Sequence, residues 1–213
     1  MTRIVAGVFG GRRLTAPSGQ QTRPTSDRVR EALFSSLESL YGGDLRDLRF
    51  ADLYAGSGAV GLEALSRGAS DAVFVESDPR TAKIVRDNIA TLGVTARTQV
   101  LTSKVTTAVA GPPPGGAFDV IFADPPYAVG EDEVAAVLAG LAENGWLAPD
   151  AVVVVERSRR SPEPSWVQDI TGERSRRYGE TTLWYGRAVL RRPESGEPAP
   201  QEAEPQAAEG MAQ

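Results

Sequence analysis

The chain of 213 residues contains no cysteine and no histidine. Without cysteine it cannot be a disulfide-stabilised scaffold, and without either residue it lacks the ligands that most structural and catalytic zinc sites use. The absence of histidine also excludes any nucleophile–histidine triad. The sequence therefore predicts no metal site and favours chemistry that needs no covalent intermediate.

Long hydrophobic runs are missing as well. No apolar segment approaches the roughly 20 residues that cross a bilayer, and residues 1–7 are too poor in apolar side chains for a signal peptide. We expect a cytoplasmic monomer without a membrane partner. The length fits one domain with small extensions. We divide the chain into an N-terminal β-hairpin extension at 1–22, a main domain at 23–190 and an acidic tail at 191–213, whose Pro, Glu and Ala content predicts disorder.

Charge is unevenly distributed along the chain, although the net charge is only −5. Residues 193–213 contain five Glu and neither Lys nor Arg. Residues 1–30 contain six Arg and one Asp, and residues 157–192 contain nine Arg and four acids. Basic ends around an acidic middle predict a phosphate-binding rim around a site, although a solvated arginine surface would give the same pattern.

The most informative stretch is Asp124-Pro125-Pro126-Tyr127. It follows residues 118–123, an apolar run that is typical of a buried strand. Two prolines cannot continue a central strand, and each restricts the residue before it, so the chain leaves the sheet in a stiff loop. Proline offers a carbonyl acceptor and no N–H donor. The loop thus presents a carboxylate, a bare carbonyl and an aromatic ring.

This combination suits an exocyclic amine on a flat heterocycle. The carboxylate of Asp124 and the carbonyl of Pro125 could accept the two amine protons, and Tyr127 could stack on the ring. Two acceptors would aim the nitrogen lone pair, which is electrostatic and positional catalysis. A plain strand-to-helix turn is the competing interpretation, because Asp-Pro is ordinary turn chemistry.

A second motif lies earlier in the chain. Residues 50–54 read as a strand, and residues 56–61 follow with the pattern G-x-G-x-x-G before a helix. The glycines allow a tight turn and close approach of a ligand to a helix N-terminus. Glu76 closes the next strand, at the spacing where an acid accepts from ribose hydroxyls. Together these features predict a nucleoside cofactor.

Strands and helices alternate through the main domain, which predicts an α/β fold with a doubly wound, mostly parallel sheet. In a 3-2-1-4-5 strand order, strands one and four are neighbours at the switch point, so the two motifs would face one crevice. We expect helices at 26–40, 79–92 and 131–142. The expected strands are 50–54, 72–75, 97–101, 118–123 and 151–156, with an antiparallel pair, 166–171 and 181–189, around 176–179.

Several stretches together resemble a known family, the bacterial 16S rRNA (guanine-N2) methyltransferases called RsmD. The stretches are Arg3-Ile-Val-Ala-Gly, Gly11-Arg-Arg-Leu, residues 22–34 beginning Thr-Arg-Pro-Thr, residues 52–64, Asp124-Pro-Pro-Tyr and Gly179-Glu-Thr. The resemblance covers about residues 2–190. It implies the seven-stranded class I methyltransferase fold of Rossmann-like type, S-adenosylmethionine as cofactor, and methylation of one guanine N2 amine in small-subunit rRNA or its ribonucleoprotein particle.

The site residues follow from the motifs and from this resemblance. For the amine, the candidates are Asp124, Pro125, Pro126 and Tyr127. For the cofactor, they are Asp52, Tyr54, Ala55, Gly56, Ser57, Gly58, Glu76, Ser77, Ser103 and Asp124. For RNA phosphate, they are Arg3, Arg12, Arg13, Arg23 and Arg28. Relatives often carry an acid after strand three for the adenine amine, whereas this chain has Thr102-Ser103-Lys104.

Three other functions fit parts of the pattern. An adenine-N6 DNA methyltransferase would use the same tetrapeptide, but it would normally need a larger recognition domain. A nicotinamide-dependent oxidoreductase would need only the glycine loop and the acid. A non-catalytic rRNA-binding assembly factor would use the arginine rim and leave the amine loop without a purpose.

Overall fold

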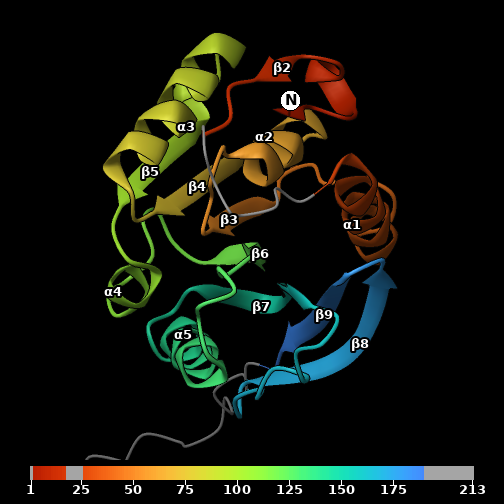
Figure 1. Cartoon of the computed structure of the whole chain (residues 1–213), viewed down its shortest axis with the longest axis vertical. Helices are drawn as coiled ribbons and strands as arrows, with labels where there is room; N and C mark the ends of the chain where they lie inside the picture. Colours follow the sequence, from red (N-terminus) through yellow and green to blue (C-terminus); the bar gives the residue numbers. More distant parts are fainter. Residues whose placement is uncertain (1, 18–25, 190–213) are drawn as a thin grey trace, which may run out of the picture.

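A computed structural model describes residues 2–17 and 26–189 and contains one central sheet of seven strands within them. The strand order is β5-β4-β3-β6-β7-β9-β8 (Figure 1). β3 to β7 are parallel, and β9 pairs antiparallel with both β7 and β8. The strands are β3 (Arg49–Leu53), β4 (Asp71–Glu76), β5 (Thr98–Thr102), β6 (Phe118–Ala123), β7 (Leu147–Ser158), β8 (Ile170–Tyr178) and β9 (Thr181–Ala188). The predicted doubly wound, mostly parallel sheet is confirmed.

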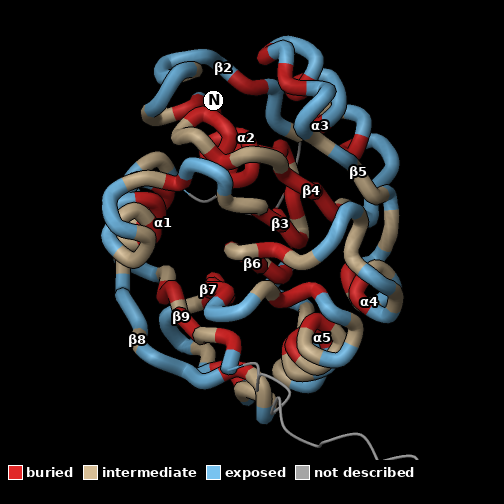
Figure 2. The backbone as a smooth tube through the Cα atoms, turned by 180° about the vertical axis from the view of Figure 1, so that it is seen from behind, coloured by how far each residue is buried: buried red, intermediate tan, exposed pale blue. Residues whose placement is uncertain are grey.

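Helices cover both faces of this sheet (Figure 1). One apolar core joins the sheet to α1, α2 and α3, and a second joins its other face to α4 and α5. Figure 2 shows the buried backbone concentrated in the central strands. The helices are α1 (Asp27–Leu40), α2 (Ala59–Ser66), α3 (Pro79–Leu92), α4 (Val105–Val109) and α5 (Glu131–Glu143), with short 3-10 turns η1 (Gly7–Phe9) and η2 (Thr95–Arg97).

Local signals in the sequence fix two of these helices. Ser26 caps α1, and its side chain accepts a hydrogen bond from the backbone N–H of Val29. Asp78 caps α3, Pro79 occupies its first turn, and Gly93 ends it with a positive φ of 73°. The predicted helices 26–40 and 79–92 are confirmed to within one residue.

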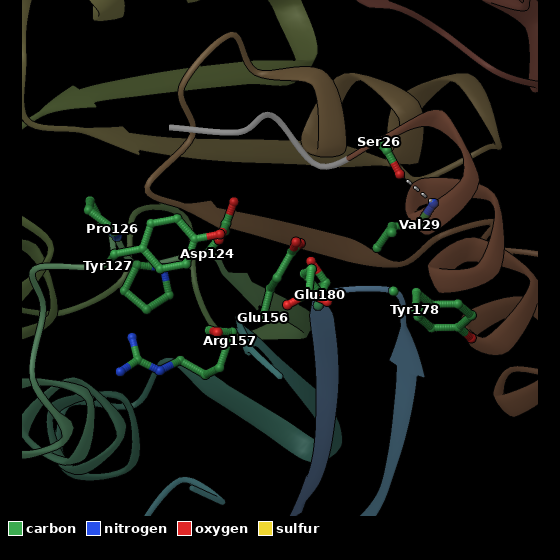
Figure 3. Close-up of a pocket in the computed structure, with 13 residues that line it drawn as sticks. Ser26, Val29, Asp124, Pro126, Tyr127, Glu156, Arg157, Tyr178 and Glu180 are labelled. Carbon is green, nitrogen blue, oxygen red and sulfur yellow. Dashed lines mark hydrogen bonds between the residues drawn. The ribbon is translucent and has the colours of Figure 1, made fainter. Parts of the chain in front are cut away.

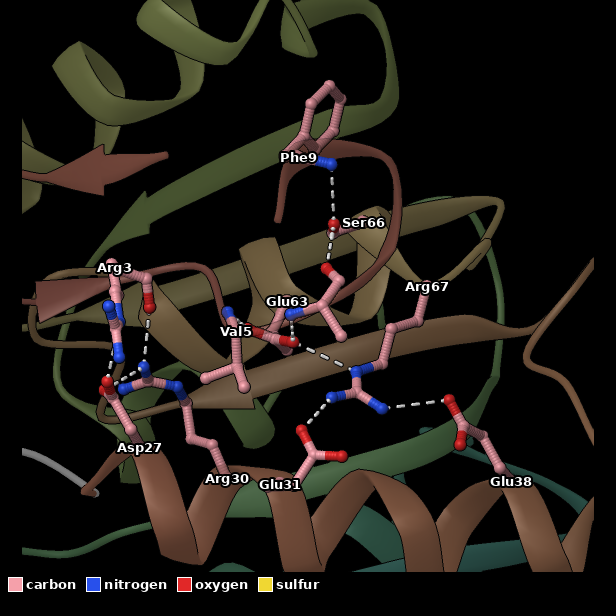
Figure 4. Close-up of polar contacts among 11 residues, drawn as sticks. Arg3, Val5, Phe9, Asp27, Arg30, Glu31, Glu38, Glu63, Ser66 and Arg67 are labelled. Carbon is pink, nitrogen blue, oxygen red and sulfur yellow. Dashed lines mark hydrogen bonds and ion pairs between the residues drawn. The ribbon is translucent and has the colours of Figure 1, made fainter. Parts of the chain in front are cut away.

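The N-terminal arm (residues 2–17) forms a small two-stranded sheet, β1 (Thr2–Arg3) with β2 (Arg13–Leu14), and packs against α2. Glu63 of α2 is fully buried and accepts hydrogen bonds from the backbone N–H groups of Val5 and Ala6 at 2.6 and 2.8 Å (Figure 4). It also binds Arg67 one turn along the helix. The other ion-pair partners of Arg67 are Glu31 and Glu38 of α1. This network joins the arm, α1 and α2.

Two further side chains hold the same arm. The hydroxyl of Ser66 accepts from the N–H of Phe9 at 2.9 Å and donates to the carbonyl of Ala6. The side-chain amide of Asn88 donates to the carbonyls of Thr15 and Ser57, both at 2.9 Å. The arm is therefore attached to the scaffold of the glycine loop.

In the predicted C-terminal antiparallel pair, the strand at 181–189 is confirmed as β9, but its partner was displaced. The strand expected at 166–171 is β8 at Ile170–Tyr178, so residues 176–178 lie in a strand and not in the turn. The turn follows at Gly179, which has a φ of 61°. β8 is the outermost strand and its side chains are mostly exposed, so it lacks the apolar run by which a buried strand is found.

Arg30 of α1 is buried, although its charge would be expected to face solvent. It is 1% exposed, and it donates hydrogen bonds to the carbonyl of Arg3 at 2.6 Å and to Asp27 at 2.8 Å. The arm covers this part of the helix, which a helical periodicity in isolation could not indicate. Within residues 2–17 and 26–189, no helix is long and apolar enough to span a membrane.

Candidate active site

The two sequence motifs meet at the switch point of the sheet. β3 lies between β4 and β6, with Leu53 opposite Ala123 in the parallel pair. The glycine loop leaves the carboxyl end of β3, and Asp124 leaves the carboxyl end of β6. The N–H of Asp124 lies 3.5 Å from the carbonyl of Leu53. Ligands of open α/β sheets bind at such a point, and the predicted adjacency of the two loops is confirmed.

The glycine loop is shaped by close packing on one side and open space on the other. A Cβ on Gly61 would lie 2.4 Å from the ring of Phe74, so this glycine lets α2 approach β4 closely. Gly56 has a φ of 55°, and a Cβ there would meet nothing within 4 Å. The backbone at Gly56 is therefore accessible to a ligand at the N-terminal end of α2.

Glu76 lies at the end of β4, beside this open backbone. Its carboxylate accepts hydrogen bonds from the N–H of Gly56 at 3.0 Å and from the N–H of Asp78 at 2.9 Å. Each carboxylate oxygen has a second lone pair. Glu76 thus fixes the loop and keeps acceptor capacity for hydroxyl donors of a ligand.

Asp52 and Tyr54 are turned into the protein. Asp52 is 2% exposed and accepts a hydrogen bond from the N–H of Gly61 at 2.9 Å. Burial raises the pKa of Asp52 to about 8 against the opposing effect of that bond. Tyr54 has a φ of 65°, unusual for a bulky residue, and burial, then the nearby charge of Glu133, raises its pKa to about 12.

The remaining cofactor candidates lie along the same edge. Ala55 and Ser57 are buried within the glycine loop, and Ser77 is exposed just after β4. The hydroxyl of Ser103 donates to the carbonyl of Lys104 at 3.1 Å. Neither Thr102 nor Ser103 caps the following helix, because the N-cap of α4 is Lys104, whose side chain makes no capping hydrogen bond.

Asp124, Pro125, Pro126 and Tyr127 line a pocket of about 230 Å³ (Figure 3). This is below the roughly 300–1,000 Å³ of whole small-molecule sites, so it suits a single ring system. Tyr127 is 68% exposed, which leaves its ring face available for stacking. Glycine-loop residues do not line this pocket. Asp124 therefore stands between the open glycine backbone on the β3 side and the ring-sized pocket on the β7 side.

The residues that form the opposite wall of the pocket were not among the candidates from the sequence. Ser26 and Val29 of α1 contribute to it, together with the ends of β7, β8 and β9. Glu156 could have been found, since it ends the predicted strand 151–156 next to the strand that precedes Asp124. Tyr178 could not, because it was expected in a turn. The wall residues from these strand ends are Glu156, Arg157, Ser158, Tyr178, Gly179, Glu180 and Thr181.

The predicted RNA-binding arginines are only partly brought together. Arg28 is exposed beside the pocket residue Val29. Arg3 is exposed but paired with Asp27 at 3.0 Å. Arg12 donates to the carbonyl of Thr91 on α3, and Arg13 is exposed in β2. Arg23 lies outside the described residues.

The family described as Conserved hypothetical protein 95 matches residues 2–187 of the chain. The chain belongs to this family. Ribosomal RNA small subunit methyltransferase D of Escherichia coli is 39% identical over 154 residues, or 72% of this chain and 73% of that protein. The Bacillus subtilis protein named "Putative rRNA methyltransferase YlbH" is 36% identical over 180 residues, or 84% of this chain and 95% of that one.

Solved structures agree with this membership. The structure described as "Putative methyltransferase yhhF from Escherichia coli" superposes with a TM-score of 0.77 and 31% sequence identity, covering 89% of this chain and 98% of that one. The resemblance to the RsmD-type methyltransferases and the predicted class I methyltransferase fold are confirmed. Within the described part of the chain, no group of three or more metal-ligating side chains could hold an ion.

Proposed function

We propose that this member of the family transfers a methyl group from S-adenosylmethionine to the exocyclic N2 amine of one guanine in 16S rRNA. The observation that carries the proposal is the position of Asp124, between the open glycine loop of β3 and a ring-sized pocket. The similarity to a small-subunit rRNA methyltransferase supports the class of substrate.

The residues at the end of β3 and β4 fit the cofactor. Gly56 offers open backbone at a helix N-terminus, and Glu76 offers acceptors for ribose hydroxyls. Asp52 acts on the loop, because its buried carboxyl group accepts a hydrogen bond from the N–H of Gly61. When bound, S-adenosylmethionine supplies an electrophilic methyl group, with the C–S electron pair leaving on sulfur. The flanking residues of this binding site are Tyr54, Ala55, Ser57, Gly58, Ser77 and Ser103.

The loop at Asp124 prepares the amine. The carboxylate of Asp124 and the carbonyl of Pro125 accept the two N2 protons and draw the nitrogen toward a tetrahedral geometry with its lone pair directed at the methyl group. Asp124 also accepts the proton that the alkylated nitrogen releases. Tyr127 stacks on the base, which must be unpaired or flipped out of its helix to enter.

The test is transfer of labelled methyl from S-adenosylmethionine to naked rRNA, unmethylated small subunits and genomic DNA, each offered separately and digested to nucleosides. We expect label in N2-methylguanosine, and the better acceptor identifies the substrate. Label in N6-methyladenine would favour a DNA methyltransferase. Binding of a nicotinamide cofactor without binding of S-adenosylmethionine would favour an oxidoreductase, and rRNA binding without transfer would favour an assembly factor.

Substitution of Asp124 tests, in the same assay, whether this residue takes part in methyl transfer. Asp124→Ala should lower turnover on the order of 100- to 1,000-fold while calorimetry still detects binding of S-adenosylhomocysteine. Asp124→Asn keeps one acceptor oxygen and should retain more turnover than the alanine variant. Near-normal turnover of Asp124→Ala would remove Asp124 from the proposed role.

A further inference from the structure

We propose that Glu156 selects guanine as the target base by accepting the N1–H of its Watson–Crick edge. This inference rests on the proposed function and adds to it the residue that distinguishes guanine from adenine. The amine loop alone does not make that distinction, because adenine also carries an exocyclic amine that Asp124 and Pro125 could hold.

Strand register places Glu156 beside Asp124. β6 and β7 are parallel, and Ala123 is opposite Val155. Asp124 directly follows the end of β6, and Glu156 follows Val155 in β7, so the two residues lie at the carboxyl ends of neighbouring strands. Both line the pocket, and Figure 3 shows their side chains next to each other on the same side of the sheet end.

Burial distinguishes Glu156 from Glu180, the third acid of the pocket. Glu156 is 7% exposed, whereas Glu180 at the hairpin turn is exposed. A carboxylate withdrawn from water forms stronger hydrogen bonds with a ligand and is costly to leave facing an unsuitable one. Arg157, the next residue, directs its guanidinium to Glu131 and to the carbonyl of Val129. Its guanidinium therefore stabilises the loop before α5 and the first turn of that helix.

The two neighbouring carboxylates match two neighbouring donors of guanine. Guanine presents N1–H and the N2 amine side by side, and Asp124 with Pro125 holds the amine. Glu156 is then the acceptor for N1–H. Adenine has a bare acceptor at N1, so the carboxylate would face a second acceptor, and N1 would lose its hydrogen bond to water without gaining another. The pocket would thus reject adenine by placing two hydrogen-bond acceptors against each other.

The test compares two bases at the methylated position. Once the modified guanine has been mapped, small-subunit rRNA is ligated from a synthetic segment that carries either guanine or 2-aminopurine there. 2-Aminopurine keeps the N2 amine and has an acceptor at N1. We expect the native protein to prefer guanine in kcat/KM by about 10- to 100-fold. In Glu156→Gln the amide can donate to the bare N1, so this preference should shrink at least about tenfold.

A matched control is Glu143→Gln. Glu143 is an exposed carboxylate at the C-terminal end of α5, next to the strand ends opposite the site, and its variant should keep the native preference. A folded Glu156→Gln that retains the native preference, or that is inactive on both bases, would overturn the inference while the proposed function stands. If the native protein transfers no methyl group to the guanine RNA, the proposed function itself fails.

A second substitution at the same position tests the inference if Glu156→Gln does not fold. Glu156→Asp keeps the charge but withdraws the carboxylate, so transfer to guanine should fall while transfer to 2-aminopurine should rise. An equal loss on both bases would indicate a structural role and overturn the inference. Thermal unfolding and binding of S-adenosylhomocysteine establish in each variant that the fold and the cofactor site are intact.

Discussion

At the scale of single residues, the buried carboxyl group of Asp52 makes the stability of the folded protein depend on pH. The folded protein raises its pKa from 3.8 to about 8, chiefly by burial. Between these two values the folded state keeps a proton that the unfolded chain has released. The contribution of Asp52 to stability is therefore lost as the pH rises through this range, by at most about 1.4 kcal/mol per pH unit.

This sign gives a prediction for Asp52→Asn, which is uncharged and keeps an oxygen for the N–H of Gly61. The free energy of unfolding of the native protein should decrease from pH 5 to pH 8 relative to that of the variant, because only the native protein must take up a proton at residue 52 when it folds. Urea unfolding at several pH values measures the difference. Parallel pH profiles for the two proteins would show that Asp52 is ionised throughout.

At the scale of helices and strands, the arm is held by buried charge. Glu63 is fully buried, and its oxygens serve two backbone N–H groups and Arg67. Glu63→Gln would replace one acceptor by a donor and leave Arg67, itself 6% exposed, short of a partner. We expect a loss of about 3–5 kcal/mol in the free energy of unfolding, measured in urea.

The matched control lies in the same network. Glu31 binds the same Arg67, but its side chain is 49% exposed. Glu31→Gln should cost less than about 1 kcal/mol, because solvent screens the pair and hydrates the charge that remains. Similar losses for Glu31→Gln and Glu63→Gln would mean that burial does not set the strength of these contacts.

The same elements show what the sequence could predict. Strands 50–54 and 118–123 were found because parallel strands buried on both faces are continuous apolar runs, and strand-order rules then brought Asp124 to the glycine loop. β8 was misplaced because an edge strand needs no such run. The burial of Glu63 and Arg30 was missed, because tertiary contact with the arm decides it and helical periodicity does not.

At the scale of the whole molecule, the basic ends of the sequence converge near the pocket. In both whole-molecule views α1 lies next to the end of β8 (Figures 1 and 2). Arg28 precedes the pocket residue Val29, and Arg176 lies two positions before the pocket residue Tyr178, on the same face of its strand. Both arginines are exposed. This arrangement suits the phosphates that flank a base entering the pocket.

Salt dependence of RNA binding tests this convergence. Each of Arg28→Ala and Arg176→Ala should weaken binding to small-subunit rRNA and reduce the slope of log affinity against log salt by about 0.7 to 0.9, the value for one lost phosphate contact. Arg46→Ala is the matched control, since Arg46 is exposed and lies just before β3, at the end of the sheet opposite the site. If phosphate contacts near the pocket set the salt dependence, the slope of log affinity against log salt for Arg46→Ala should equal that of the native protein. An equal reduction in all three variants would mean that net charge, and not a phosphate-binding rim at the pocket, governs the interaction.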